Sequence, residues 1–465
     1  MGKQPNILFL FSDQHRGDWM PYDPEYKKAQ GVEDLELNMP VIRALMDQGT
    51  AFTQAISPAP VCAPARACLA AGKRYRSCRV FWNTANYDAA LPSFYNKLHN
   101  AGYYVCGTGK FDLNKADLEW GDGYHKLLQD MGFDAATDSE GKMDTIWAAG
   151  LDNPGPYGRM LQEHGWLEAH KEDMLNRGNS DKVTPLPDDM YADNWVGEKS
   201  KQMLAGLSKD QPWFMQVNFS GPHDPWDITQ KMKDSVKDRT FPMAADCPFE
   251  EANQKVRQNY AAMIENIDRL CGEIIEVVRQ RGELENTVIV YAADHGEMMG
   301  DHGLYGKSKP GHGSIHIPMV ISAPAFGAAC GKTVTAPVEL QDLANTFLDY
   351  AGLEHTDNRD SQSLRPILEG KTERVRDLVV SELMVPRAGG KINTFAVIFD
   401  GKWKVIIRPN GAEQLYDIEN DPFEMNDLAA EHPEMIEEYK KELGKRDGRK
   451  IPGMEQYAKS FMLMG

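Results

Sequence analysis

Two pairs of polar residues in this sequence each follow a short hydrophobic run that is typical of a buried strand. The pairs are Asp13-Gln14 and Asp294-His295. Two carboxylates, an amide oxygen and an imidazole are ligands that hold a divalent cation and leave positions open for substrate oxygens. An aspartate after a strand is also a common helix N-cap. Either pair alone therefore favours a cap, and only the two pairs together indicate a cation site.

Cys62 lies in a proline-rich stretch, residues 57–66, that ends at Arg66. The most common fate of a free cysteine is burial as a small apolar side chain. A helix that begins near Pro64 would instead place Cys62 at a helix N-terminus with Arg66 facing it. That environment suits an activated anion or a bound tetrahedral anion. The residues alone leave both interpretations open.

Three further polar side chains lie in short motifs that contain glycine. Lys110 ends a Gly-Thr-Gly-Lys run, His223 ends a Gly-Pro-His run, and Lys307 follows Tyr-Gly. By themselves the lysines favour surface salt bridges and the histidine favours a capped turn. Five residues that could form a sugar pocket lie near these motifs, although each is also explained by packing or loop structure: Trp82, Asn83, Asn86, Trp226 and Asp227.

The elements that must position these residues alternate between strands and helices. Such alternation predicts an α/β fold, in which a large, mostly parallel central sheet is sandwiched by helices. Ligands bind at the carboxyl ends of the strands in such sheets. Residues 119–188 lack clear periodicity, and we interpret them as insertions that shape a pocket rather than core. The predicted strands are 6–12, 103–107, 213–219 and 287–292, and the predicted helices are 38–48, 90–101 and 253–281.

The pattern changes after about residue 370. Short strand-like runs at 378–381, 396–399 and 403–407 are followed by a helix at 434–445, with Asp400-Gly401 as a hairpin turn. These elements predict a small antiparallel sheet with a covering helix. The expected organisation is therefore an α/β catalytic domain, residues 1–370, and a smaller C-terminal α+β subdomain, residues 371–465.

Composition limits the class of partner. The chain has 465 residues and a net charge of -18, which argues against nucleic acid because phosphate binding needs a basic surface. The seven cysteines lack paired CxxC spacing, so reduced thiols are expected. The first hydrophobic run, residues 7–11, is too short for a signal peptide or a membrane span. As given, the sequence predicts a cytoplasmic protein with no membrane partner, or a periplasmic or secreted one whose signal has been removed.

The run from Cys62 to Lys73, Cys-Ala-Pro-Ala-Arg-Ala-Cys-Leu-Ala-Ala-Gly-Lys, resembles a family signature. It is similar to Cys-x-Pro-Ser-Arg-x-x-Leu-x-Thr-Gly-Arg of the formylglycine-dependent (type I) sulfatases, in the alkaline phosphatase superfamily. The resemblance covers essentially the whole chain. Its other motifs lie at residues 5–13, 107–110, 221–223, 293–297, 300–307 and 415–422.

The resemblance implies hydrolysis of a sulfate monoester, with a small sulfated saccharide as the expected substrate. A separate formylglycine-generating enzyme would oxidise Cys62 to formylglycine, whose hydrate attacks sulfur and then collapses to the aldehyde. The implied roles of the other residues are shared between metal binding and substrate binding. A divalent cation, usually calcium, would be ligated by the oxygen derived from Cys62 and by Asp13, Gln14, Asp294 and His295. The nucleophile would be held by Arg66. Sulfate would be bound by Lys110 and Lys307, and the leaving oxygen would be protonated by His223.

Three departures from the family pattern keep alternatives open. Ala65, Ala71 and Lys73 replace the usual serine, threonine and arginine that the modifying enzyme reads. An unmodified, sulfate-binding pseudoenzyme is therefore one alternative. Gln14 with His295 recurs in phosphonate monoester hydrolases and in some bacterial sulfatases, so a phosphonate monoester or phosphodiester hydrolase is another. Asp112 stands where many sulfatases carry a histidine; Asp112, His302 or His312 could then serve as the base that regenerates the aldehyde.

Overall fold

The computed structural model describes residues 4–178, 182–356, 360–386 and 392–447. Its centre is an eight-stranded sheet with the strand order β10-β2-β9-β7-β1-β6-β4-β5. All neighbouring pairs are parallel except the two that β9 makes. The predicted α/β fold with a mostly parallel sheet is confirmed. The strands are β10 (Lys332–Val334), β2 (Thr50–Phe52), β9 (Met319–Ser322), β7 (Thr287–Ala293), β1 (Asn6–Asp13), β6 (Trp213–Pro222), β4 (Tyr104–Gly109) and β5 (Ala135–Asp138).

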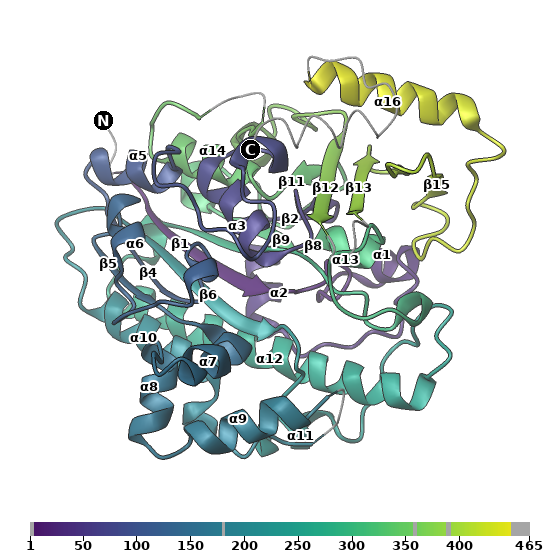
Figure 1. Cartoon of the computed structure of the whole chain (residues 1–465). Coiled ribbons are helices and arrows are strands. Elements are labelled where there is room, and N and C mark those ends of the chain that lie inside the picture. The colour runs from purple at the N-terminus through teal and green to yellow at the C-terminus, as the bar shows by residue number, and fades with distance from the viewer. Residues whose placement is uncertain (1–3, 179–181, 357–359, 387–391, 448–465) are drawn as a thin grey trace.

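Helices cover both faces of this sheet (Figure 1). Ile7, Phe9 and Phe11 of β1 pack into one apolar cluster, whereas Leu8 and Leu10 pack into the other. Successive side chains of a strand point to opposite faces, so a strand buried on both faces is apolar throughout. Burial of each such side chain contributes about 1.5–3 kcal/mol. One face carries α3 (Cys62–Ala71), α5 (Phe94–Asn100) and α14 (Asp342–Tyr350), and the other carries α2 (Pro40–Asp47), α10 (Ala192–Ala205) and α12 (Glu250–Gln280).

Residues 119–188 form more regular structure than the sequence predicts. They contain α6 (Lys126–Asp130), α7 (Gly141–Gly150), α8 (Pro156–Glu163) and α9 (Leu167–Asn176), as well as the edge strand β5. Tyr157 and Leu161 of this region belong to the core cluster around β6. The interpretation of the region as non-core insertions is therefore wrong in this respect. These helices are short, so the 3.6-residue periodicity barely repeats before each one ends.

A separate four-stranded antiparallel sheet follows, as predicted. Its strands are β12 (Val379–Pro386), β13 (Ile392–Phe399), β14 (Trp403–Ile407) and β15 (Glu413–Asp417). The strand-like runs of the sequence did not include β15. The helix α16 (Pro433–Asp447) lies beside this sheet (Figure 1). Apolar residues of this sheet join the same core cluster as β1 and α3. The domain boundary at residue 370 stays a prediction.

The remaining elements are short. A three-stranded sheet is formed by β11 (Val338–Glu339), β3 (Ala55–Ile56) and β8 (His316–Ile317); the short helices are α1 (Pro24–Ala29), α4 (Tyr75–Cys78), α11 (Gln230–Val236), α13 (His312–Ile315) and α15 (Arg365–Leu368). Within the described ranges, no helix is both long enough and apolar enough to cross a bilayer.

Candidate active site

Four adjacent parallel strands carry most of the predicted site residues at their carboxyl ends. The strands are β7, β1, β6 and β4, in that spatial order. Because parallel strands end at the same edge of a sheet, residues hundreds of positions apart in the chain converge there. Asp13 ends β1 and Gln14 follows it, Asp294 and His295 follow β7, His223 follows β6, and Lys110 follows β4.

Cys62 reaches this edge from a different element. It is the first residue of α3, so the prediction of a helix beginning near Pro64 is confirmed within two residues. Its side chain is completely buried. The next backbone N–H, that of Ala63, donates to Oδ1 of Asn83 at 3.1 Å and so satisfies one of the free donors at the helix start.

A glycine sets the path of the chain into Lys110. Gly109 has a φ of 88°, and a Cβ atom there would lie 1.9 Å from the carbonyl oxygen of Asn218. No other residue fits this close approach. The same carbonyl oxygen accepts the backbone N–H of Lys110 at 3.1 Å. The end of β4 is thereby fixed against β6.

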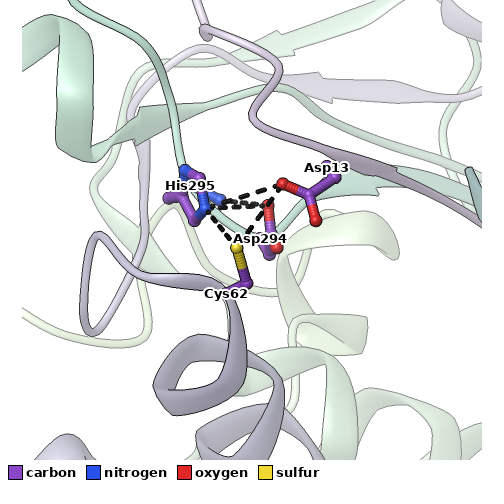
Figure 2. A group of neighbouring side chains, drawn as sticks. All are labelled: Asp13, Cys62, Asp294 and His295. Carbon is purple, nitrogen blue, oxygen red and sulfur yellow. Dashed lines mark hydrogen bonds and ion pairs between the residues drawn. The ribbon is translucent and has the colours of Figure 1, made fainter. Parts of the chain in front are cut away.

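Asp13, Cys62, Asp294 and His295 form a buried cluster whose ligand atoms all lie within 4.8 Å of one another. Figure 2 shows the four side chains converging from β1, α3 and the segment after β7. Cys62 Sγ lies 3.3 Å from His295 Nε2 and 3.7 Å from Asp13 Oδ1. His295 Nδ1 lies 3.0 Å from the carbonyl oxygen of Gly296. That carbonyl can only accept, so the proton is assigned to Nδ1 and the Nε2 lone pair faces the cluster.

Gln14 completes the predicted ligand set. Its backbone N–H donates to Asp294 Oδ1 at 3.0 Å. Its Oε1 is buried and has no hydrogen-bond partner among the described residues. A buried carbonyl oxygen without a partner costs about 1–3 kcal/mol, and a cation at this point would remove that cost. The donors present therefore fit a divalent cation.

Arg66 holds both aspartates of the cluster. Its Nε donates to Asp294 Oδ2 at 2.8 Å and its Nη2 donates to Asp13 Oδ2 at 3.2 Å. Burial lowers the pKa of the Arg66 guanidinium, but Asp294 and Asp13 outweigh it and raise that pKa above its ordinary value. Arg66 is therefore charged and orients the carboxylates of the two expected metal ligands. Its expected contact with the nucleophile stays a prediction.

Arg66→Ala is expected to destabilise the metal-free protein by about 3–5 kcal/mol, because it leaves Asp294 as a buried carboxylate without its cation. Calcium should restore part of this loss. Urea denaturation with calcium and with chelator measures both effects. Arg43→Ala is the control, because its pairs with Asp23 and Asp47 are exposed and are worth under about 1 kcal/mol. An identical loss with and without calcium would contradict the assignment.

Two lysines and a histidine surround the sulfur atom of Cys62. Lys307 Nζ lies 2.7 Å from Sγ and 2.5 Å from His223 Nε2, and Lys110 Nζ lies 3.9 Å from Sγ. Burial raises the pKa of the Cys62 thiol, but Lys110, Lys307 and His295 bring that pKa well below its ordinary value. The surroundings of position 62 therefore favour negative charge.

A cavity of about 220 Å³ opens beside Lys110, His223 and Lys307. Glu140 and Asp144 also line it, which confirms that residues 119–188 shape a pocket. Within the described part of the chain, no phenylalanine, tyrosine or tryptophan lines it. Two larger grooves, of about 830 and 770 Å³, lie away from these residues, along α12 and beside the C-terminal sheet.

Two pocket lysines escaped the sequence analysis. Lys115 lies between Asp112 at 3.0 Å and Asp144 at 2.7 Å. Lys142 Nζ donates to Asp227 Oδ1 and to the carbonyl oxygen of His223, both at 2.7 Å. Lys142 thus holds the segment that carries His223. Both lysines precede or lie in short helices without a recognisable motif, so no spacing could have identified them.

Of the five residues proposed for a sugar pocket, Asn83 alone lines the cavity. Trp226 is 3% exposed and packs against Tyr305, so packing, the alternative explanation, holds for this residue. Asp227 is equally buried and is held by Lys142. Asn86 donates to Asp117 at an exposed position. Two of these side chains are therefore structural.

Asp112 is buried and its carboxylate lies 3.3 Å from Lys110 and 3.0 Å from Lys115. Burial raises the pKa of Asp112, but the two ammonium groups outweigh burial and hold that pKa well below its ordinary value. A carboxylate held so firmly in its ionised form is a poor base, so this geometry favours a positioning role. His302 contacts the carbonyl oxygen of Phe423, and the His312 ring packs against His316 with the two rings tilted.

A family model described as sulfatase matches residues 5–353. The chain belongs to the sulfatase family. A second model, the N-sulphoglucosamine sulphohydrolase C-terminal region, matches residues 300–448 of this sulfatase. The protein is thus a sulfuric ester hydrolase of a family that uses a divalent cation and a formylglycine made from cysteine.

Individual relatives agree with the family and the fold. The choline-sulfatase of Rhizobium meliloti (strain 1021) is 28% identical over 459 residues, which cover 92% of this sulfatase and 82% of the relative. The crystal structure of the phosphonate monoester hydrolase of Agrobacterium radiobacter has a TM-score of 0.78 at 24% identity and covers 96% of each chain. A structure in complex with its substrate D-glucosamine-2-N,6-O-disulfate has a TM-score of 0.73 at 19% identity, covering 96% of this sulfatase and 98% of that chain.

Proposed function

We propose that this sulfatase hydrolyses the sulfate monoester of a small saccharide, with Cys62 as the precursor of its nucleophile. One observation carries the proposal: Lys307 Nζ lies 2.7 Å from Cys62 Sγ, and the same sulfur atom belongs to the buried cluster with Asp13, Asp294 and His295. A group at position 62 therefore lies next to both the expected cation ligands and an ammonium group. Formylglycine at this position supplies, as its hydrate, a hydroxyl nucleophile in the family.

The residues of this chain then divide the work of binding and proton transfer. Lys307 and Lys110 bind the sulfate oxygens and offset charge that develops in the transition state. His223 Nε2 faces the same point, and its Nδ1 contacts the carbonyl oxygen of Asp224. Nε2 accepts from the Lys307 ammonium, and we propose that this atom is the one that passes a proton to the departing alcohol oxygen. Lys142 and Asp224 keep the ring in place.

Calcium is the proposed cation. Asp13, Gln14 and Asp294 offer oxygen ligands, which calcium prefers, and His295 adds one nitrogen. A bound cation supplies positive charge that favours an ionised hydroxyl at position 62. Reconstitution of chelator-treated protein with calcium, manganese or zinc tests the choice. Full recovery with zinc and none with calcium would overturn it.

The pocket supports a small, polar alcohol. Its lining provides the carboxylate of Asp144, the amide of Asn83 and lysine ammonium groups, which are hydrogen-bonding partners for hydroxyl groups. The structural neighbour bound to a sulfated glucosamine supports the same class. A screen of sulfated monosaccharides and oligosaccharides, with release of inorganic sulfate as the readout, tests the proposal. Turnover of oligosaccharides alone would contradict a small substrate.

A second candidate is hydrolysis of phosphonate monoesters or phosphodiesters with the same nucleophile. Gln14 and His295 favour it, because an amide and an imidazole lower the negative charge around the cation and so tolerate a more highly charged ester. Paired aryl sulfate and aryl phosphonate esters separate the two activities. A kcat/KM for phosphonate far above that for sulfate would replace the leading proposal.

Maturation by a formylglycine-generating enzyme is the remaining requirement. The protein from its native host is therefore expected to carry formylglycine in the tryptic peptide that spans residues 44–66. Mass spectrometry of this peptide measures the converted fraction. A peptide wholly at the thiol mass would favour the unmodified, sulfate-binding pseudoenzyme.

A further inference from the structure

The side-chain amide of Gln14 has an unusual environment for a metal ligand. Its Nε2 donates to Asp224 Oδ1 at 3.0 Å and also to Glu297 Oε2. An amide NH2 group has two donors, so both are satisfied by carboxylates. Its Oε1 is left without a partner among the described residues. The two carboxylates therefore decide which end of the amide is left without a partner.

Glu297 is the more constrained of the two carboxylates. It is completely buried, whereas the side chain of Asp224 is half-exposed. The other oxygen of Glu297, Oε1, accepts the backbone N–H groups of Met299, at 3.1 Å, and of Gly306. Gly306 directly precedes Lys307 in the chain. One carboxylate thus joins the end of β1 to the loop that carries a sulfate-binding lysine.

We propose that Glu297 is a positioning residue that orients the Gln14 amide so that Oε1, rather than Nε2, faces the cation. The inference rests on the proposed cation site. It also explains why residue 14 is an amide. A carboxylate there would face the carboxylates of both Asp224 and Glu297, and like charges at this distance repel strongly in a buried site. The amide supplies an oxygen ligand and two donors at once.

Glu297→Gln tests the orientation directly because it changes one oxygen into an NH2 group. The backbone donors of Met299 and Gly306 cannot reverse, so the new amide keeps its oxygen toward them and turns its NH2 group toward Gln14. Gln14 must then rotate and present its own NH2 group to the cation. We expect the Kd for calcium to rise at least tenfold, measured by calorimetry on metal-free full-length protein.

A double-mutant cycle separates this role from general structural damage. Gln14→Glu should weaken calcium binding in the wild-type background, because two carboxylates then face each other. In the Glu297→Gln background the same change should strengthen calcium binding, because the NH2 group introduced at position 297 can donate to the carboxylate introduced at position 14. Equal effects of Gln14→Glu in both backgrounds would overturn the proposal. Tighter binding by the single variant Gln14→Glu would overturn it too, even if Glu297→Gln does not fold.

Two measurements keep this inference distinct from the proposed function. Melting in chelator reports whether each variant is folded, independently of activity. Asp224→Asn is the matched control: its amide oxygen can still accept from the same nitrogen while the charge is lost, and we expect less than a threefold change in Kd. A loss equal to that of Glu297→Gln would overturn the assignment to Glu297. Absence of calcium binding by the wild type would instead reject the cation site itself.

Discussion

Lys307→Ala is expected to lower kcat/KM by about a hundredfold or more, which corresponds to about 2.7 kcal/mol of transition-state stabilisation. Lys307 Nζ lies 2.7 Å from Cys62 Sγ and 2.5 Å from His223 Nε2, in a partly buried site at the cavity. An ammonium group there binds sulfate oxygens where the surrounding protein limits access of water, so its charge is less screened than at the surface. The variant also releases His223 from a fixed contact, which should reduce proton transfer to the leaving group.

The measurement must separate chemistry from maturation. Activity should be divided by the formylglycine fraction of the 44–66 peptide, because a variant beside Cys62 can also change conversion. Lys126→Ala is a suitable control, since Lys126 pairs with Asp130 on an exposed helix surface. Unchanged melting with a hundredfold loss would support the role. Near-normal kinetics per formylglycine would remove Lys307 from the site.

Asp294→Ala is expected to abolish both turnover and stabilisation by calcium. Asp294 lies at the centre of the cluster: Oδ1 accepts the backbone N–H groups of Gln14 and His295, and Oδ2 accepts from Arg66. Loss of a bound cation removes several kcal/mol of charge stabilisation, so we expect a rate loss of about a thousandfold or more. Asp294→Asn keeps the shape and tests the charge alone.

Thermal melting over a calcium titration measures the second effect. A cation that binds only the folded state stabilises it by about 2.7 kcal/mol at a concentration one hundred times its Kd. The wild type should therefore melt at a higher temperature in calcium than in chelator, and Asp294→Ala should show no difference. An equal calcium-dependent shift in both proteins would exclude Asp294 as a ligand.

The fold could be predicted wherever a periodic pattern was long enough to repeat. β1 is apolar at every position from Ile7 to Phe11, and α12 carries an apolar stripe over eight turns, so both were predicted within a few residues. Residues 119–188 form four short helices, none longer than ten residues. Tertiary packing, rather than local propensity, holds such helices in place, which is why the sequence did not predict them.

The candidate site divides in the same way. Asp13, Cys62 and Asp294 were found because each lies in a local motif next to a strand end or helix start, and the parallel topology brings these ends together. Lys115 and Lys142 lie in no motif, and only the fold places them at the pocket. For Trp226 the sequence left packing and a sugar pocket both open, and the structure shows packing.

The sequence by itself determined which residue types stand at the strand ends and at the start of α3, and therefore the family and its chemistry. Only the tertiary structure decided their partners. Gln14 is oriented by Glu297, 283 residues away, and Cys62 is faced by Lys307, 245 residues away. The physical reason is that charge stabilisation and amide orientation depend on distances of a few ångströms. Those distances are set by which strands lie side by side, and no local pattern records them.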